Sequence, residues 1–501
     1  MSYLSIEFSA IFILFFGVYW SFRSSVAIQN LILLISSYLI VGLFNIHFAM
    51  ILGSYTVVLY LLSTGIVYSL RPKLWLAISV IAAVGNLAVF KYFNFFAPQL
   101  QHQLGEWGID LSLPVAEIIL PIGISFYTFH SMSYLVSIYE RAVDQRNTGI
   151  PSEKWRGMAP VSFFDFALFL SFFPSIIAGP INRAKLFLPK LQDPTPRSVL
   201  EPHRAFMLII LAVIKVYWLS AFFSQAFVKP MFDNPSEYHT IELILAIYAY
   251  AIEIYLNFSG YTDLVTGIAL LLGFQLPENF KAPYLAVNLK DFWTRWHISL
   301  STWIRDYIYF PLGGNRKGFS RTQINVMIGM VLSGLWHGET LNFLIWGTIH
   351  GIGVVLLNMK DHYRERRLYQ NGMESDAVRE LMRQEVVGWR KYWGRFMTFN
   401  YVGIGWLFFR SESFEDSMAY ITALLNNYHD LTDHWLPLAI LAGFIIVIFA
   451  IYPILTKLPD LCIKITKRIP FLLLPIIYIF VSWIVIYLAP SGIPQFIYAS
   501  F

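Results

Sequence analysis

Three histidines, His297, His337 and His350, stand among apolar and aromatic residues in the second half of the chain. His337 lies in the middle of residues 324–351, where two apolar arms flank the short polar segment WHGET, residues 336–340. A neutral imidazole titrates near the working pH of most enzymes and can take a proton from a hydroxyl group. This position makes His337 a candidate general base, although a single histidine in an apolar segment is more often a hydrogen-bonded packing residue.

The sequence lacks the patterns that are typical of other kinds of catalytic or metal-binding site. The spacing of the three histidines would suit a metal site only if folding brought them together, and no HExxH pattern supports one. No GxSxG elbow, Walker A loop or GxGxxG loop is present. The single cysteine, Cys462, excludes a disulfide within the chain and a thiolate cluster, and is expected to pack as a small apolar residue. We therefore expect no metal.

Polar residues within apolar segments are costly and indicate a functional site. Here they concentrate between residues 253 and 350, and the residues 279–318 alternate basic and aromatic side chains. Such side chains favour the membrane interface, so we expect this segment at the cytoplasmic face, partly dipping inward. Its basic residues would attract an anionic ligand or simply orient the chain. The residues concerned are Glu253, Asn257, Ser259 and Asp263, then Lys290, Arg295, Arg305 and Arg316 with Trp293, Trp296, Trp303, Tyr307 and Tyr309.

The composition is that of a membrane protein. Of 501 residues, 57% are hydrophobic and only 13% are charged, against about 25% charged in soluble domains. The net charge of +5 comes from short loops between apolar runs, and no basic groove for nucleic acid is apparent. We therefore predict an all-α polytopic membrane protein with one membrane-embedded domain, residues 1–501, and no nucleic-acid partner.

Membrane-spanning helices need about 20 mostly apolar residues. The N-terminal segment lacks a positive region and a cleavage site, so we interpret it as a retained span and not a signal peptide. The predicted spans are residues 3–20, 25–41, 47–70, 74–96, 114–138, 205–228, 241–258, 396–410, 436–456 and 469–488.

Lys and Arg in the loops predict the orientation. The positive-inside rule places the basic loops in the cytoplasm and both termini outside, provided that residues 161–180 and 281–358 do not cross. Pro174, Gly179 and Pro180 interrupt the first of these, which we expect to be re-entrant. Residues 361–395 mix both charges at helical spacing, which predicts a solvated cytoplasmic helical hairpin with a docking role as the alternative. The basic loops are 71–73, 140–156, 183–204, 361–395 and 457–468, and the loops poor in Lys and Arg are 97–113, 230–240, 411–435 and 489–501.

Many short motifs in the same order give this chain a family resemblance. It resembles the membrane-bound O-acyltransferases of the bacterial alginate and peptidoglycan O-acetyltransferase type over most of residues 90–410. Relatives often have histidine at the position of Asn400, so we expect no catalytic role there. The motifs are FKYFNFF (90–96), LPIGISFYTFHSMSYLVSIY (120–139), FPSIIAGPINR (173–183), LNFSGYTDLVTGIALLLGF (256–274), ENFKAPY (278–284), DFWTRWHISLSTWIRDYIYFPLGG (291–314), VLSGLWHG (331–338) and TFNYVGIGWLFFR (398–410).

The resemblance implies a fold and catalytic residues. It implies about ten or more transmembrane helices in a ring around a thin core with re-entrant segments. The invariant histidine of the family corresponds to His337, the expected general base, and a second family histidine corresponds to His297. His297 would orient the thioester or stabilise the oxyanion. No bound cofactor is expected, and the acyl donor would be acetyl-CoA or another thioester. The expected substrate-binding residues are Asn257, Asp263, Lys290, Trp296, Arg305, Asp306 and Trp336.

The resemblance also implies a reaction. A chain of this type in the bacterial cytoplasmic membrane would move an acetyl group from a cytoplasmic thioester for O-acetylation of peptidoglycan or an alginate-like exopolysaccharide. A separate periplasmic transferase would be the partner. Two alternatives stay open: D-alanyl transfer to teichoic acid, and a transporter or flippase, which would also bury polar residues.

Overall fold

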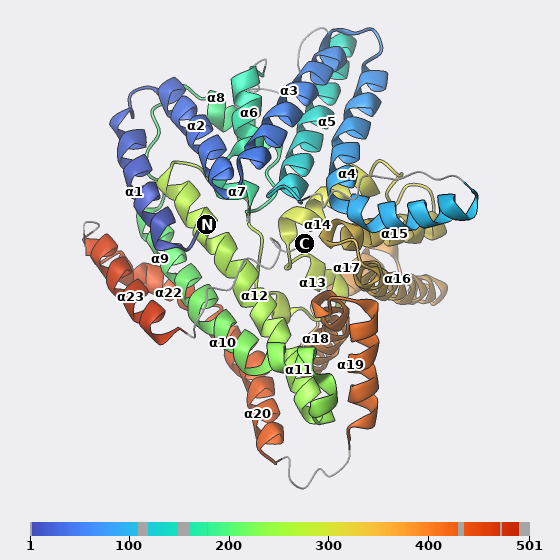
Figure 1. Cartoon of the computed structure of the whole chain (residues 1–501). Coiled ribbons are helices and arrows are strands. Elements are labelled where there is room, and N and C mark those ends of the chain that lie inside the picture. The colour runs from blue at the N-terminus through green and yellow to red at the C-terminus, as the bar shows by residue number, and fades with distance from the viewer. Residues whose placement is uncertain are drawn as a thin grey trace. The chain divides into compact units, whose positions relative to one another are not determined.

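A computed structural model describes residues 3–108, 119–148, 161–177, 179–428, 435–470 and 473–489. Every regular element within these ranges is helical, which confirms the predicted fold class (Figure 1). The chain divides into two compact units, Met1–Ile209 with Tyr261–Pro277, and Ile210–Gly260 with Glu278–Ile497. The single domain and the ring of helices stay predictions. Parts of the predicted span 114–138 and of the loops 97–113, 140–156, 411–435 and 489–501 lie outside the described residues.

Polar caps and prolines explain where several helices of the first unit begin. The side chains of Ser5, Ser25 and Asn45 each accept a hydrogen bond from a backbone N–H in the first turn, and Pro72 opens the fourth helix. The helices are α1 (Ile6–Ser21), α2 (Val26–Phe44), α3 (Ile46–Tyr68), α4 (Pro72–Glu106), α5 (Ile124–Thr148), α6 (Phe163–Ser171), α7 (Phe173–Ile176), α8 (Ala184–Gln192) and most of α9 (Pro202–Val213).

The second unit carries the motifs singled out above. It includes most of α12 and a group of short elements that precede three long helices. Its helices are η2 (Ile214–Ser220), α10 (Ala221–Phe223), η3 (Ser224–Val228), α11 (Lys229–Asp233), η4 (Pro235–Glu237), α12 (Thr240–Leu271), η5 (Pro283–Leu285), α13 (Leu289–Trp293), α14 (Ile298–Ile304), η6 (Arg305–Tyr309), α15 (Phe319–His337), α16 (Leu341–Gln370), α17 (Ser375–Arg383), α18 (Trp389–Arg410), α19 (Phe414–Asn426), α20 (Trp435–Ile446), η8 (Val447–Ile451), α21 (Tyr452–Leu455), α22 (Leu458–Thr466) and α23 (Leu474–Leu488).

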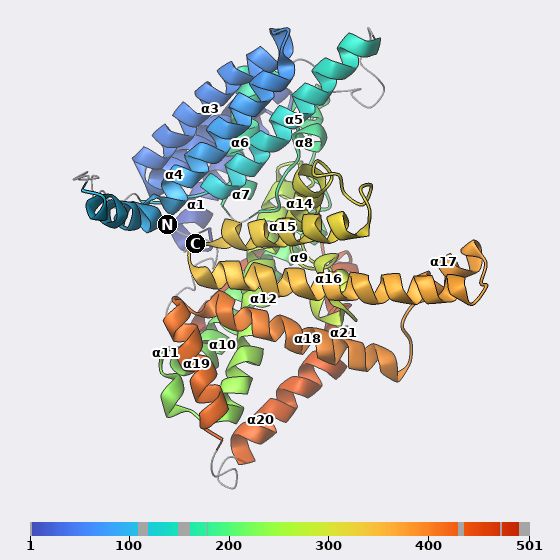
Figure 2. The ribbon, with the colours of Figure 1, turned by 90° about the vertical axis from the view of Figure 1, so that its right-hand side faces the viewer.

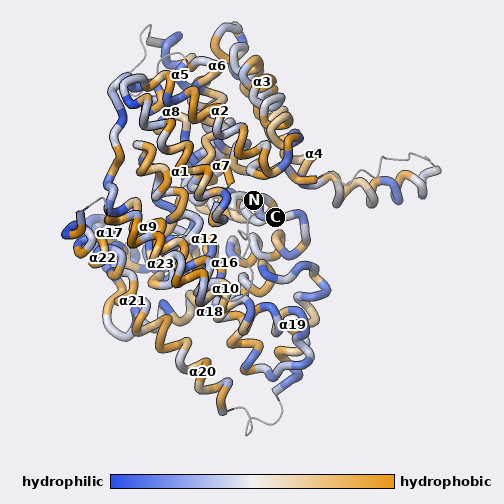
Figure 3. The backbone as a smooth tube through the Cα atoms, turned by 60° about the vertical axis from the view of Figure 1, so that its left-hand side comes forward, coloured by the Kyte–Doolittle hydropathy of each residue, from blue (hydrophilic) through white to orange (hydrophobic). Residues whose placement is uncertain are grey.

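Seven helical stretches among the described residues are long and apolar enough to cross a membrane. Six of them correspond to predicted spans, and α1 and α23 are shorter apolar helices at two further predicted positions. Figure 3 shows the apolar residues that run along α20. The seven stretches are Val26–Phe44, Ile46–Tyr68, Pro72–Phe93, Pro202–Asp233, Thr240–Leu271, Leu341–Gln370 and Trp435–Thr466.

The stretch Leu341–Gln370 overlaps residues 281–358, which we expected not to cross. The structure shows a hairpin of two long helices, α15 and α16, in this region (Figure 2). A helical hairpin starts and ends on the same side, so it is compatible with the predicted orientation of the flanking loops, which stays a prediction.

Residues 161–180 fit the expectation more closely. Helix α6 has nine residues, or about 14 Å at 1.5 Å per residue, and the helix breaks at Phe172 before Pro174. A hydrocarbon layer is about 30 Å thick, so this helix is too short to cross it.

The charged segment 361–395 is helical, as predicted. It comprises the exposed end of α16 and the short helix α17, where Asp376 pairs with Arg379 at 3.6 Å and Val378 is buried. Figure 3 shows the hydrophilic residues of α17. Its cytoplasmic location stays a prediction.

Glycines set the close approach of α15 and α16. A Cβ atom on Gly334 would lie 2.2 Å from the carbonyl oxygen of Phe343, and one on Gly347 would lie 2.6 Å from that of Met330. Small residues let membrane helices approach in this way. The two helices are therefore held together near their connection, where His337 is the last residue of α15.

We expect Gly334→Ala to destabilise the second unit, because its methyl group would press on backbone that cannot move aside alone. Overpacking of this kind costs about 1–3 kcal/mol. Thermal unfolding of the detergent-solubilised protein would measure the loss as a lower Tm. The matched control is Gly85→Ala in α4, whose Cβ would meet nothing within 4 Å. Equal Tm values for both variants would contradict this packing.

Candidate active site

His337 sits at the tip of the α15–α16 hairpin, enclosed by aromatic rings. Its side chain is 2% exposed. The ring centroids of Trp336, Trp346 and Phe409 lie 4.8, 5.1 and 5.1 Å from that of His337. Helices α15, α16 and α18 thus each supply part of the enclosure, and α16 lies between the other two (Figure 2).

Asn342 connects this tip to the end of α18 through hydrogen bonds. Its amide nitrogen donates to the carbonyl oxygens of Ser411 and Ser413, at 2.9 and 2.7 Å, and its amide oxygen accepts from Ser417 Oγ at 3.1 Å. The amide is fully buried, so these bonds offset the cost of removing it from water. They keep Phe409 beside His337.

His297 is held by a second buried amide, Asn279. Its Nδ1 lies 3.0 Å from Asn279 Oδ1, and Ser299 donates to the same oxygen from its Oγ at 2.8 Å and its backbone N–H at 3.3 Å. His297 has φ of +43°, a left-handed conformation that is uncommon outside glycine, and it precedes α14. The bonds to Asn279 help to retain this backbone conformation.

These bonds define which nitrogen of His297 carries the proton. A backbone N–H can only donate, so the atom of Asn279 that meets Ser299 is the amide oxygen. That oxygen only accepts, so His297 Nδ1 donates to it and Nε2 keeps its lone pair. Burial lowers the pKa of His297 to about 3, which keeps the ring neutral. His297 therefore presents an acceptor, and not a donor, at Nε2.

The two histidines share an aromatic neighbour. The ring centroid of Trp336 lies 5.9 Å from His297 and 4.8 Å from His337, and Phe258 packs edge-on against His297 at 4.8 Å. Residues 40 positions apart in the sequence are thus brought to one aromatic cluster within the second unit. An imidazole enclosed this way can exchange a proton with a hydroxyl that reaches it, shielded from bulk water.

The structure gives the remaining predicted residues varied surroundings. Trp336 borders both histidines, whereas Trp296 is buried against Trp406 at 4.9 Å as part of the core. Lys290 forms an ion pair with Asp361. Asn257 is buried on α12 and directly precedes Phe258 in the sequence. Arg305 and Asp306 pair with each other at 2.8 Å. Asp263 belongs to the first unit.

Asn400 makes two hydrogen bonds within the described residues. Its amide oxygen accepts from the hydroxyl of Tyr248 and its amide nitrogen donates to the carbonyl of Phe396, both at 2.8 Å. These bonds give the Asn400 side chain a structural role, and the absence of a catalytic role stays a prediction.

Sequence reasoning missed Asn279, Ser299 and Trp346. Asn279 lies within the motif ENFKAPY, but nothing in its spacing connects it with His297, 18 residues later. Trp346 stands in an apolar run, where a tryptophan is normally a packing residue.

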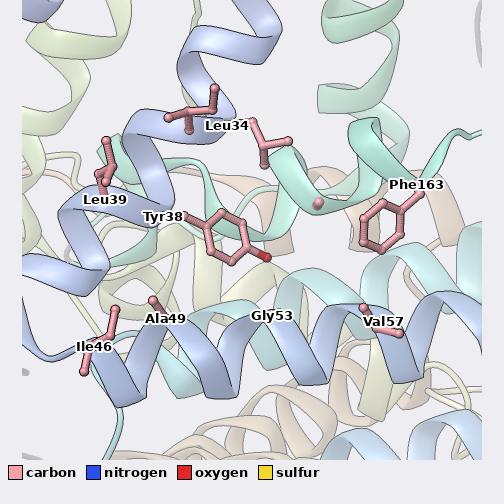
Figure 4. A pocket seen from close by; sticks show the side chains of 10 residues that line it. Leu34, Tyr38, Leu39, Ile46, Ala49, Gly53, Val57 and Phe163 are labelled. Carbon is pink, nitrogen blue, oxygen red and sulfur yellow. The ribbon is translucent and has the colours of Figure 1, made fainter.

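The first unit holds an apolar pocket of about 560 Å³ between α2, α3 and α6 (Figure 4). Its single polar side chain, Tyr38, is hydrogen-bonded through its hydroxyl to Thr56 at 3.2 Å. The lining includes no histidine, carboxylate or thiol, so this pocket is no candidate for acid–base chemistry. No group of His, Cys, Asp and Glu in the described ranges could hold a metal ion.

Comparison with known proteins places the chain in a family. The model of the membrane-bound O-acyltransferase family, MBOAT, matches residues 126–375, which include both histidines. The chain belongs to this family and is a multi-pass membrane O-acyltransferase.

The names of its relatives refer to alginate, peptidoglycan and teichoic acid. The chain is 34% identical to the "Probable alginate O-acetylase AlgI" of Pseudomonas aeruginosa over 80% of its own length and 70% of that protein. It is 31% identical to the peptidoglycan O-acetyltransferase of Helicobacter pylori over 70% of this chain and 65% of that one. It is 26% identical to the teichoic acid D-alanyltransferase of Streptococcus thermophilus over 58% and 68%, respectively.

Two substitutions of His297 test which of its ring nitrogens is bonded to Asn279. Asparagine places an amide near the position of Nδ1 and tolerates positive φ, so His297→Asn keeps the bond to Asn279 and the Tm of the wild type. Glutamine reaches only the position of Nε2, so His297→Gln loses that bond and about 1–3 kcal/mol of stability. The thermal unfolding of both purified variants measures this order. A variant His297→Gln more stable than His297→Asn would contradict the bond between Nδ1 and Asn279.

Proposed function

We propose that this chain transfers an acetyl group from a cytoplasmic thioester, such as acetyl-CoA, for O-acetylation of a cell-envelope polysaccharide in the bacterial cytoplasmic membrane. The observation that carries the proposal is the buried His337 at the hairpin tip, which shares its neighbour Trp336 with His297, in a chain similar to acetylases of alginate and peptidoglycan. The acceptor class follows from the names of those relatives.

His337 acts as the general base. It takes the proton of the acceptor hydroxyl while the hydroxyl oxygen attacks the thioester carbonyl carbon. The carbon–sulfur bond then breaks, the thiolate leaves, and the proton held on His337 passes to the sulfur. A thioester is already activated, so positioning the two reactants and moving this proton are the tasks left to the protein.

His297 orients a reactant through its acceptor nitrogen. Because Nδ1 donates to Asn279, Nε2 can accept a proton-bearing group of the donor or the acceptor. A neutral ring in this tautomer offers no N–H at Nε2 to a developing oxyanion. Of the two roles expected from the resemblance, the geometry thus favours orientation of the thioester.

The loop after η6 is the part of the chain that we expect to attract an anionic donor. The charges of Lys290 and Arg305 are offset by Asp361 and Asp306, whereas Arg316 is exposed. A positive loop near the donor entrance would raise the local concentration of a carrier such as CoA or an acyl carrier protein. This role requires the cytoplasmic orientation that the basic loops predict.

A separate periplasmic transferase would pass the acetyl group to the polymer. D-alanyl transfer to teichoic acid is the second candidate, favoured by the similarity to the D-alanyltransferase, although that similarity is lower at 26% identity. A transporter without covalent chemistry is disfavoured by membership of an acyltransferase family.

We expect His337→Ala to lower the ester content of the envelope polysaccharide at least about 100-fold, because general-base catalysis supplies roughly 10²–10⁴-fold. Base-labile acetate released from purified polymer is the measurement, normalised to the amount of protein in the membrane. His102→Ala, at an exposed histidine of α4, is the matched control and keeps the wild-type ester content. Wild-type acetate in a correctly inserted His337→Ala variant would instead favour transport.

A further inference from the structure

A buried cluster of ring nitrogens lies next to His337. Trp346 and His350, one turn apart on α16, have ring centroids 4.9 Å apart, and Trp293 of α13 lies 5.2 Å from His350. Trp346 and His350 are 1% and 0% exposed, respectively. The nitrogens of these three residues are enclosed by α13, α16 and α18 in the second unit.

The ring nitrogens of these three residues lack hydrogen-bond partners within the described residues. Neither ring nitrogen of His350 has a hydrogen-bond partner in the described part of the chain, and the same holds for the indole nitrogens of Trp293 and Trp346. Buried polar atoms in folded proteins nearly always find a partner. Three such side chains in one cluster therefore indicate a bound ligand that supplies the missing hydrogen-bond partner.

The kind of ligand follows from counting donors and acceptors. Each indole nitrogen is a donor only, and a neutral imidazole has one donor and one acceptor. The cluster therefore offers three N–H donors against one acceptor, so its partner must chiefly accept. We propose that Trp293, Trp346 and His350 form a binding site for a hydrogen-bond-accepting oxygen atom. That oxygen belongs either to the acyl carbonyl of the donor or to a buried water molecule.

The position of the cluster connects it with the reaction. The ring of Trp346 stands at 87° to that of His337, with centroids 5.1 Å apart. A Cβ on Gly405 would lie 2.8 Å from His350 Nε2 and 3.3 Å from Trp346 Cδ1, so both polar edges face this glycine of α18. Trp346 thus bridges the general base and the donor cluster.

An oxygen atom bound here would take part in acyl transfer. This inference rests on the proposed function. Negative charge develops on the thioester carbonyl oxygen during attack, and preorganised N–H donors in a dry site stabilise it. His297 offers no N–H there, whereas Trp346 and His350 do. With water as the ligand, His350 is instead a positioning residue that fixes Trp346 against His337.

The test compares His350→Gln with His350→Phe. Glutamine retains a donor and an acceptor, and phenylalanine retains only the ring volume. With acetyl-CoA as the donor, we expect His350→Phe to lower kcat by about 100-fold and His350→Gln by less than about 10-fold, as for loss of one oxyanion donor. Trp346→Phe, which removes the indole N–H and keeps an aromatic ring, should resemble His350→Phe. Equal kcat for His350→Phe and wild type, or equal losses for Gln and Phe in folded protein, would overturn the proposal.

A high-resolution structure of the wild type with and without acetyl-CoA tests the site apart from turnover. Oxygen density within hydrogen-bonding distance of both His350 and Trp346 supports the site. Density continuous with the acetyl group identifies the carbonyl, and a separate peak in both structures identifies water. No density in either structure overturns the proposal. An occupied site in a protein whose His337→Ala variant keeps wild-type ester content would refute the proposed function and leave the oxygen site intact.

Discussion

The close approach of α15 and α16 is the constraint on which the site depends. Gly334 and Gly347 leave no room for side chains where the two helices meet, so the backbones pack directly. His337 ends one helix and Trp346 lies early in the other, and their rings meet edge to face as a result. A membrane offers little hydrophobic force between helices, so this backbone contact and the Asn342 bonds must hold the tip.

Two buried amides position the residues of this aromatic cluster. Asn342 keeps α18 and Phe409 in place, and Asn279 selects the neutral His297 tautomer with a lone pair at Nε2. Each amide is almost fully buried, so its hydrogen bonds must be made within the protein. The same rule explains why the ring nitrogens of Trp346 and His350, which lack hydrogen-bond partners within the described residues, are informative.

The sequence predicted the fold class and most of the apolar helices, because apolar length reports membrane helices directly. The catalytic roles of His337 and His297 rest on the ordered motifs that contain them and stay predictions. The α15–α16 hairpin was not predicted, since a glycine contact between helices leaves no periodic signal. Asn279 was missed because its partner is 18 residues away, and the ion pair of Lys290 with Asp361 depends on a turn that no local pattern specifies.

The central claim is that His337 deprotonates the acceptor beside a bound thioester. The most direct measurement is a structure of the protein with a non-hydrolysable acetyl-thioester analogue. The account predicts that the carbonyl carbon of the analogue lies next to the His337 ring, with a path from that ring toward the acceptor side. An analogue bound elsewhere, with His337 still sealed among Trp336, Trp346 and Phe409, would contradict it.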